Sequence, residues 1–567
     1  MNSGAWTVQN AGTMIFTHIR FRPILSIGLA GLMLACAAGD PVETARQSIT
    51  VDEVIAWTQR LASDEFQGRA PSSPGEERTI AYLRDEFQKL GLQPGNGGDF
   101  YQPVPLVDIT VQGSPTLEVT GKGEALQFAY GPEAVFWTKR VVESVALQDS
   151  ELVFAGYGVV APEYGWNDYE GLDAAGKTVV LLVNDPGYGS GDESLFNGRS
   201  MTYYGRWTYK YEEAARQGAA GALIIHQRDP AGYGWDTVRN SWTGPQFDLV
   251  RQDDNMSRVA VEGWLTLEAA RTLLERAGQD LEALQQQALS QDFKAVGLGL
   301  SASLSLSNNL RRSNSNNVLA VLPGSENSEE YLVYMAHWDH FGLDESLEGD
   351  QIYNGALDNA TGVAGLLALA KAYSGLPEPP SRSVLFLAVT AEEQGLLGSA
   401  YYAANPVYPP RRTVAAINMD GLNIHGPMKD ITVIGYGNSE LDDYLDEAAQ
   451  QDGRTVRGDP EPEKGYYYRS DHFSFAKVGI PALYTDAGID HLEHGQEWTR
   501  QKREEYIANN YHRVSDEYDP SWDMSGAVDD LRILFSVGYR IANSSDYPNW
   551  REGTEFKATR DADMEGK

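Results

Sequence analysis

Short apolar runs in the second half of the chain each end in side chains that can bind a metal. Residues 331–335 lead to His337, residues 384–389 lead to Glu392 and Glu393, and residues 414–419 lead to Asp420. A short apolar run with turn residues on both sides is typical of a buried strand in a mostly parallel sheet. In such sheets, ligands bind beyond the carboxyl ends of the strands. The pattern therefore predicts a metal site at one edge of a sheet.

Apolar positions at helical spacing flank these strands and predict helices that cover the sheet. Thr50 and Glu53 form a capping-box pattern at the start of one such stretch, and Ser73 with Glu76 forms another. A buried helical stripe follows Asp358. Strand and helix patterns then alternate from about residue 317 to about residue 542. The expected fold class is therefore α/β, with a mixed, mostly parallel sheet flanked by helices.

The stretch 131–295 interrupts this alternation and predicts an inserted, smaller, β-rich domain. It has strand patterns at residues 151–154, 178–183 and 222–225, and helix patterns at residues 212–217 and 265–284. The main domain would then consist of residues 44–130 and 300–555. Residues 307–315 are polar and predict a linker between the two domains. Residues 203–211 are rich in aromatic side chains, which is more typical of a packed interface than of a substrate cleft.

Composition limits the partners of this chain. Its 567 residues are enough for more than one domain, and its formal net charge is -35. Such a negative chain has no means of neutralising a phosphate backbone, which excludes a nucleic-acid partner. The chain has a single cysteine, Cys36, so disulfide bonds cannot stabilise the fold.

Residues 1–36 have the order of an export signal. Arg20 and Arg22 precede an apolar run over residues 24–35, which is too short to span a bilayer as a helix. The end of this run at Cys36 resembles a bacterial lipoprotein cleavage box, in which the cysteine becomes lipidated. We therefore expect an exported protein of the periplasm or cell envelope, with Cys36 as its membrane attachment. A plain secretory signal is the alternative.

The candidate metal ligands belong to a longer ordered set of motifs. The set consists of His337-x-Asp339, the segment Asn-Gly-Ala-Leu-Asp-Asn around Asp358, the pair Glu392–Glu393, Asp420, and a closing histidine at His512. In this order the motifs resemble the co-catalytic zinc aminopeptidases, a zinc exopeptidase family that includes glutamate carboxypeptidase and the transferrin receptor. The resemblance covers roughly residues 44–555. Segments 154–158 and 161–166 resemble the opening of the protease-associated domain that many relatives carry as an insertion.

The resemblance implies a site for two zinc ions in each chain. One ion would bind His337, Asp358 and Asp420, and the other would bind Glu393, His512 and the same Asp358. Three protein ligands leave one position on each ion for a shared water, as catalytic zinc sites require. By the same resemblance, the chain would be a metal-dependent exopeptidase. An aminopeptidase that attacks peptides with a metal-bridging hydroxide is the leading expectation.

Other polar residues of the motifs receive roles in catalysis. Glu392 lies beside a ligand and is the natural general base, and Asp339 is expected to orient the metal-binding imidazole. Tyr468 is a candidate oxyanion donor, with Tyr466 and Tyr467 as competitors.

The remaining histidines are weaker candidates for ligands. His472 matches a different segment of the family near the cleft, and His512 is preferred to it as the last ligand. The histidines expected in solvated loops are His340, His425, His491 and His494.

Other functions are known on the same scaffold. A receptor-like binding protein would have lost metal ligands, and here none is lost. A cyclising acyltransferase with one zinc is disfavoured by the insertion and by the full ligand set. Carboxypeptidase or dipeptidase action stays open. It needs a basic pocket for the substrate carboxylate, and the sequence does not tell whether Arg206 and Arg469 converge to make one.

Overall fold

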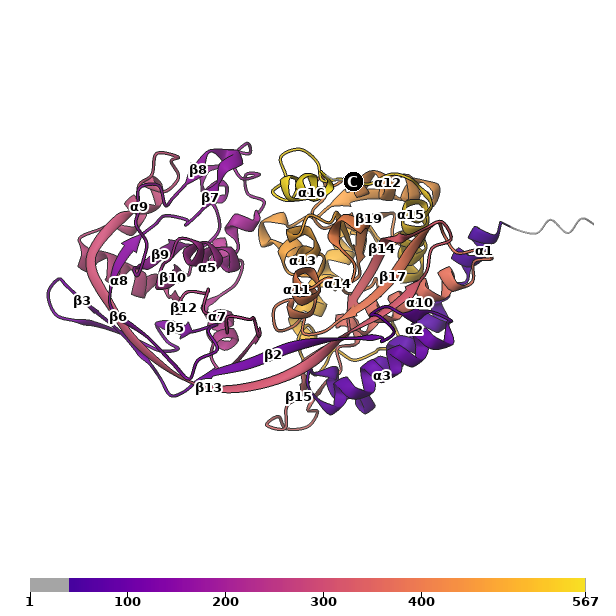
Figure 1. Ribbon diagram of the computed structural model, residues 1–567, viewed down its shortest axis with the longest axis horizontal. Helices are drawn as coiled ribbons and strands as arrows, with labels where there is room; N and C mark the ends of the chain where they lie inside the picture. Colours follow the sequence, from indigo (N-terminus) through magenta and orange to yellow (C-terminus); the bar gives the residue numbers. More distant parts are fainter. Residues whose placement is uncertain (1–39, 566–567) are drawn as a thin grey trace, which may run out of the picture. The chain divides into compact units, whose positions relative to one another are not determined.

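The computed structural model describes residues 40–565 (Figure 1). The predicted export signal and Cys36 lie outside this range, so both stay predictions. No helix among the described residues is long and apolar enough to cross a membrane. From Pro41 onward the chain clusters as one compact unit.

The carboxyl half of the chain builds a central sheet around a run of parallel strands. In spatial order these are β17 (Arg382–Val389), β14 (Asn327–His337), β18 (Thr413–Asn418) and β21 (Ala482–Asp486). Beyond β21 lie β19 (Asp430–Val433), antiparallel to it, and β20 (Thr455–Gly458), parallel to β19. Every residue of β17 and β18 is buried, which explains their continuous apolar sequences. The predicted mixed, mostly parallel sheet is confirmed.

Helices cover both faces of this sheet (Figure 1). One face carries α1 (Pro41–Gln47), α2 (Val51–Leu61), α3 (Pro74–Lys89), α10 (Gly362–Ser374), α12 (Leu441–Gln451) and α15 (Ser525–Asn543). The other face carries α11 (Leu397–Ala404) and α13 (His472–Lys477). Along β14, Leu332 and Tyr334 pack into the first core, and Val333 and Met335 pack into the second. This is the alternation that a strand buried on both faces requires.

The two predicted helix caps differ in outcome. The Ser73 side chain accepts hydrogen bonds from the backbone N–H groups of Gly75 and Glu76, which confirms the cap of α3. At Thr50 no cap bond to the backbone forms, so the predicted capping box is wrong. The Thr50 hydroxyl contacts the Glu53 carboxylate at 2.7 Å, and that carboxylate pairs with Lys371 of α10 at 2.6 Å. The Glu53 carboxylate therefore pairs with Lys371 of α10 instead of capping the backbone at the start of α2.

A second sheet forms in residues 116–306, which we call the inserted region. Its strands are β3 (Thr116–Thr120), β4 (Leu126–Ala129), β5 (Ala134–Trp137), β6 (Ser144–Phe154), β9 (Thr178–Leu182), β10 (Gly221–Ile225) and β12 (Val261–Leu265). Its main helices are α5 (Trp207–Arg216), α7 (Trp235–Trp242), α8 (Leu267–Ala277) and α9 (Leu281–Gln287). The strands predicted at 151–154, 178–183 and 222–225 are confirmed.

Two predicted boundaries in this region differ from the structure. The helix predicted over residues 265–284 divides at Gly278, whose φ of 76° ends α8. The sheet also begins before the predicted start at residue 131. Leu117 and Val119 of β3 pack into the same core as Phe154, so β3 and β4 belong to it.

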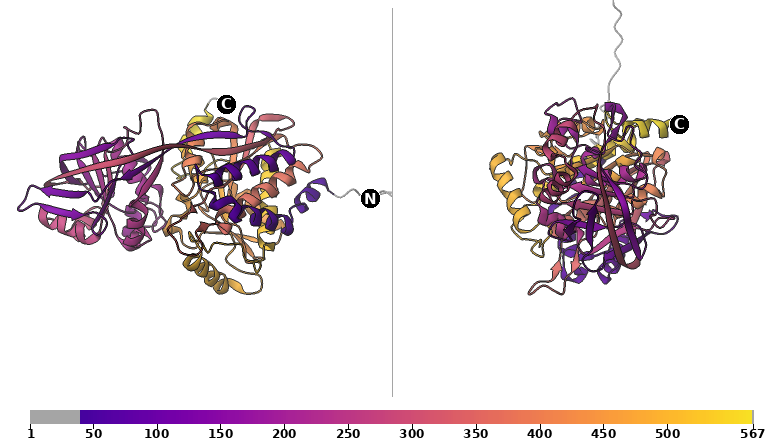
Figure 2. Two further views of the ribbon diagram at one scale, coloured as in Figure 1. Left: turned by 90° about the horizontal axis from the view of Figure 1, so that it is seen from below. Right: turned by 90° about the vertical axis from the view of Figure 1, so that its left-hand side faces the viewer.

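One long strand, β13 (Val296–Leu322), runs through both sheets. It pairs with β6, then with β2 (Tyr101–Val111), and finally with β17. The predicted linker at 307–315 is therefore wrong. These residues are polar, but they form part of a strand because their backbone N–H and C=O groups make hydrogen bonds to β2. β2 also pairs with β11 (Pro245–Leu249). Figure 2 shows β2 and β13 side by side.

The other strands and α-helices among residues 40–565 are β1 (Gln93–Pro94), β7 (Val160–Ala161), β8 (Trp166–Asn167), α4 (Pro186–Ser190), α6 (Arg228–Ala231), β15 (Gly342–Leu343), β16 (Ile352–Tyr353), α14 (Gly495–Asn509) and α16 (Lys557–Met564).

Candidate metal centre

The five residues predicted to bind metal lie together at the carboxyl edge of the central sheet. His337 ends β14, and its Nε2 lies 3.3 Å from Asp358 Oδ1 and 3.1 Å from Asp420 Oδ1. His512 Nε2 lies 3.2 Å from Asp358 Oδ2 and 3.3 Å from Glu393 Oε2. The two oxygens of Asp358 thus face different histidines. A single carboxylate therefore lies within reach of both histidines.

The segment that carries Asp358 is held by residues that the sequence analysis did not identify. The carboxylate of Asp516 accepts the backbone N–H groups of Leu357 and Asp358, each at 3.1 Å. The fully buried guanidinium of Arg69 donates to the carbonyls of Asn354 at 2.6 Å and Gly355 at 2.8 Å. These contacts join stretches far apart in the chain, so no local sequence pattern could have found them.

Negative charge is concentrated in this centre. Burial raises the pKa values of Glu392 and Glu393 well above their usual range, and Asp420 and Asp358, respectively, raise them further. Burial opposes ionisation of Asp358, but bonds from His337 and His512 hold its pKa well below the usual range. Buried carboxylates at this density are costly unless a cation neutralises them.

The donor atoms fit a metal such as zinc. Three groups of side chains have ligand atoms that all lie within 4.8 Å of one another. The groups are His337 with Asp358 and Asp420, His337 with Glu392 and Glu393, and His340 with Asp358 and Glu393. Imidazole nitrogens mixed with carboxylate oxygens are the ligands that catalytic zinc sites use.

His340 is part of this centre, so its predicted place in a solvated loop is wrong. The side chain is fully buried, and its Nδ1 lies 2.5 Å from Glu393 Oε1. Burial lowers the pKa of His340 to about 3. The signal for this role is its position directly after the strand-end motif His337-x-Asp339, at the edge of the sheet where ligands bind.

Asp339 has a different partner from the predicted one. Its Oδ1 lies 3.9 Å from His337 Nδ1, beyond hydrogen-bonding distance, whereas the Asp339 carbonyl oxygen lies 3.2 Å from the same nitrogen. The carboxylate instead accepts the backbone N–H of Glu392 at 3.0 Å. Asp339 therefore orients the imidazole through its backbone and the Glu392 turn through its side chain.

Tyr468 does not face the metal centre. It is buried, and its hydroxyl contacts Glu555 Oε1 at 3.2 Å, away from the predicted ligands. Its competitors fit no better, since Tyr467 is buried and the ring of Tyr466 stacks with Arg469. Tyr511, which the sequence analysis passed over, stacks on His512 with ring centroids 3.7 Å apart.

Tyr511 also lies beside the centre, because its ring stacks on the candidate ligand His512. The carboxylates of Asp358, Glu393, Glu392 and Asp420 lie close enough for their charges to act on its hydroxyl. Tyr511 is 45% exposed, so it is accessible to a bound substrate.

The other histidines lie outside the centre. His472 begins α13 and packs between Tyr467 and Tyr484, with ring centroids 4.7 Å and 4.8 Å away. His425, His491 and His494 surround Trp498 of α14. His494 is exposed as predicted, but His491 is buried because Trp498 covers it.

Comparison with known proteins agrees with this geometry. Residues 317–535, which contain every predicted ligand, match the model of peptidase family M28. A stretch of 168 residues is 30% identical to "Aminopeptidase NAALADL1" of Mus musculus and covers 27% of this chain and 21% of that protein. A stretch of 104 residues is 35% identical to a "Probable zinc metalloprotease" of Pyrenophora teres f. teres and covers 18% and 22% of the two chains. The chain thus aligns with about a fifth of the length of these curated relatives.

A solved structure extends over a larger share of the chain. The aminopeptidase from Aneurinibacillus sp. strain AM-1 is 20% identical, with a TM-score of 0.47, and covers 89% of this chain and 97% of that one.

Proposed function

We propose that this chain, whose residues 317–535 belong to peptidase family M28, is a zinc-dependent exopeptidase that acts on peptides, most simply as an aminopeptidase. The observation that carries the proposal is the shared carboxylate of Asp358, with one oxygen 3.3 Å from His337 and the other 3.2 Å from His512. This arrangement supports two adjacent ions rather than one. His337 and Asp420 would hold one ion with Asp358, and Glu393 and His512 would hold the other.

His340 competes with His512 for the second ion. Both imidazoles lie within 3.5 Å of Glu393, but His340 is fully buried and the His512 side chain is 37% exposed. A ligand that borders an open position must reach the substrate side of the ion, which favours His512. His340 would then fix the second oxygen of Glu393.

Bound zinc would activate a water for attack on a peptide carbonyl and polarise that carbonyl. Glu392 would take the proton of that water, because its carboxylate lies 4.0 Å from His337 Nε2 and hence beside the proposed ion. The same carboxyl group would then deliver the proton to the leaving amine. Asp339 holds the Glu392 backbone during both transfers. The hydroxyl of Tyr511, beside the same carboxylates, would donate to the oxygen that gains negative charge.

The finer predictions from sequence are part of the same proposal. We propose that the inserted region is a protease-associated domain and that the protein is exported and lipid-anchored at Cys36. The ordered motifs at residues 154–166 and 20–36 support these proposals. A receptor-like role is disfavoured, since no candidate metal ligand is missing.

Metal analysis together with activity tests the proposed function. Purified protein should contain about two zinc ions per chain, as the ligand count implies. Removing them with a chelator should abolish hydrolysis of an aminoacyl-nitroanilide, and zinc should restore it. A correctly folded protein that takes up no zinc would refute the proposal. The Asp358→Asn variant tests the shared ligand, because this change should weaken zinc binding at both proposed sites at once.

A further inference from the structure

The two histidines of the proposed metal sites are held in different ways. The carbonyl oxygen of Asp339 lies 3.2 Å from Nδ1 of His337, on the side of the ring away from the ligands. His512 presents its Nε2 to Asp358 and Glu393, but no group in the described part of the chain forms a hydrogen bond with its Nδ1. Histidines that bind metals are usually oriented by a bond to the second ring nitrogen. Whatever within the chain orients His512 is therefore a contact of another kind.

Two aromatic rings pack against the imidazole of His512. The ring of Tyr511 stacks on it, with centroids 3.7 Å apart and an interplanar angle of 28°. The ring of Phe341 meets it edge-on, with centroids 4.8 Å apart and an interplanar angle of 68°. Both arrangements are favourable for aromatic rings. A stacked ring resists tilting of the imidazole, and a ring at a steep angle to it resists sliding within the plane of the stack.

His512 needs such contacts more than His337 does. His337 ends the buried strand β14, and its side chain is 1% exposed. His512 lies in the turn after α14 with a φ of 57°, and its side chain is 37% exposed. A side chain in an exposed turn has fewer neighbours that restrict its rotamer than one at the end of a buried strand. The rings of Tyr511 and Phe341 supply that restriction.

Phe341 is itself held by a closely packed hairpin. Strand β15 pairs with β16, and Gly342 lies opposite Tyr353. A Cβ added to Gly342 would lie 2.5 Å from the Cβ of Ala70, and one added to Gly68 would collide with the Gly342 carbonyl oxygen. The two glycines, with φ values of 83° and 65°, let the backbones approach this closely. The hairpin is thus fixed against the segment before α3, and Phe341 is fixed with it.

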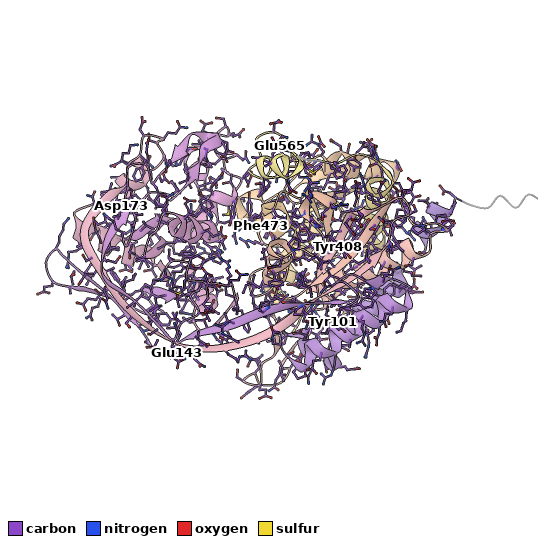
Figure 3. All side chains as sticks on the ribbon, in the orientation of Figure 1. Tyr101, Glu143, Asp173, Tyr408, Phe473 and Glu565 are labelled. Carbon is purple, nitrogen blue, oxygen red and sulfur yellow. The ribbon has the colours of Figure 1, made fainter. Side chains whose placement is uncertain are left out.

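Burial alone does not account for an aromatic side chain at position 341. Phe341 is 38% exposed, and Leu343 on the same hairpin is 45% exposed. Phe473, labelled in Figure 3, is only 5% exposed and packs on Tyr203 with ring centroids 4.8 Å apart. The free energy gained from burial scales with the apolar area removed from water, so Phe341 gains less than a core phenylalanine does. Its contact with His512 therefore makes up a larger part of its role.

We propose that Phe341 is a positioning residue, whose ring holds the His512 imidazole toward Asp358 and Glu393 and so strengthens zinc binding by these three side chains. The proposal rests on the proposed function, in which they are the ligands of the second ion. Phe341 is not a ligand, since its side chain carries no donor atom. A side chain that is already oriented loses less rotamer freedom when it binds, so the affinity of its site is higher.

Competition with a chelator, which gives the affinity for each of the two zinc ions, tests this role. Phe341→Ala should lower the affinity for one ion by about 3–10-fold, as the loss of an aromatic contact to an oriented ligand does, and leave the other unchanged. Phe341→Tyr keeps the ring and should retain both wild-type affinities. Leu343→Ala removes the exposed apolar neighbour on the same hairpin and is the matched control, which should also retain both.

Crystal structures of the metal-free wild type and Phe341→Ala give a second readout, which does not depend on zinc. The His512 ring should have one orientation in the wild type and should turn from Asp358, or adopt two orientations, in the variant.

Wild-type zinc affinities in Phe341→Ala, or the same single ring orientation in both crystals, would overturn the inference and leave the exopeptidase proposal standing. An equal loss of affinity in Leu343→Ala would also overturn it, because the hairpin as a whole would then be responsible. If Phe341→Ala does not fold, Phe341→Leu, which keeps apolar bulk without a flat ring, takes its place in both measurements. A wild-type protein that binds no zinc would refute the proposed function instead, and the crystal comparison would still decide whether Phe341 orients His512.

Discussion

Oδ1 of Asp339 accepts the backbone N–H of Glu392 at 3.0 Å. Oδ2 of the same carboxylate lies 3.4 Å from the backbone nitrogen of Glu393, and Ala391 before them has a φ of 52°. A left-handed residue at this point turns the chain sharply, so the turn needs support from outside. Asp339 supplies it and thereby sets the positions of both the proposed base and a proposed ligand.

Replacing Asp339 with Asn should therefore damage both stability and activity. The amide offers one acceptor where the turn needs two, so a buried N–H loses its partner, at a cost of about 1–3 kcal/mol in the free energy of unfolding. Urea unfolding and kcat measured on the same preparation check this. Asp344→Asn, in an exposed turn nearby, serves as the control and should change neither. A stable Asp339→Asn variant with full kcat would show that the turn holds without this carboxylate.

Glu392→Gln should separate catalysis from metal binding. The substitution preserves size and removes the group that accepts a proton, so kcat should fall by about 10²–10⁴-fold. Zinc content should stay near the wild-type value, because Glu392 is not among the proposed ligands of either ion. Metal analysis gives the zinc content, and steady-state kinetics give kcat. Hydrolysis at the wild-type rate would mean that another residue is the base.

The two candidate tyrosines predict opposite results. Tyr511→Phe should lower kcat by about 100-fold, as the loss of one donor to a developing oxyanion does. Tyr468→Phe should leave kcat within a few-fold of wild type, because its hydroxyl contacts Glu555 instead of the centre. Both variants keep their rings and hence their packing. Equal losses of kcat in the two would exclude a specific role for Tyr511.

The buried His472 should make the protein less stable in acid. Burial lowers its pKa to about 3, whereas the unfolded chain has a histidine pKa of about 6.5. At a pH between these two pKa values, His472 is protonated in the unfolded state and neutral in the folded state. Stability is therefore lost as the pH falls from about 6.5 to about 3, by up to about 1.4 kcal/mol per pH unit.

His472→Phe removes this contribution while keeping a ring between Tyr467 and Tyr484. Urea midpoints measured across this pH range should fall less steeply in the variant than in the wild type. The exposed His494 provides the matched variant, His494→Phe, which should retain the wild-type slope. Parallel curves for His472→Phe and wild type would contradict the assignment.

Much of the fold follows from patterns within short stretches. The runs that became β14, β17 and β18 are continuous and apolar because both faces of their sheet are covered. The linker expected at 307–315 failed for the complementary reason. Its polar side chains do not show the pattern of a strand. The segment is a strand because its backbone pairs with β2, which lies about 200 residues earlier in the chain.

The sequence by itself determined which residues could meet at the metal centre. Parallel strands end at one edge of a sheet, so the side chains that follow them, from His337 to Asp420, are brought together by the strand pattern alone. Only the tertiary structure decided what each side chain touches. It turned Tyr468 toward Glu555 and moved His340 against Glu393. The physical reason is that such contacts depend on how separate elements pack and where each side chain points, and neither is encoded in local spacing.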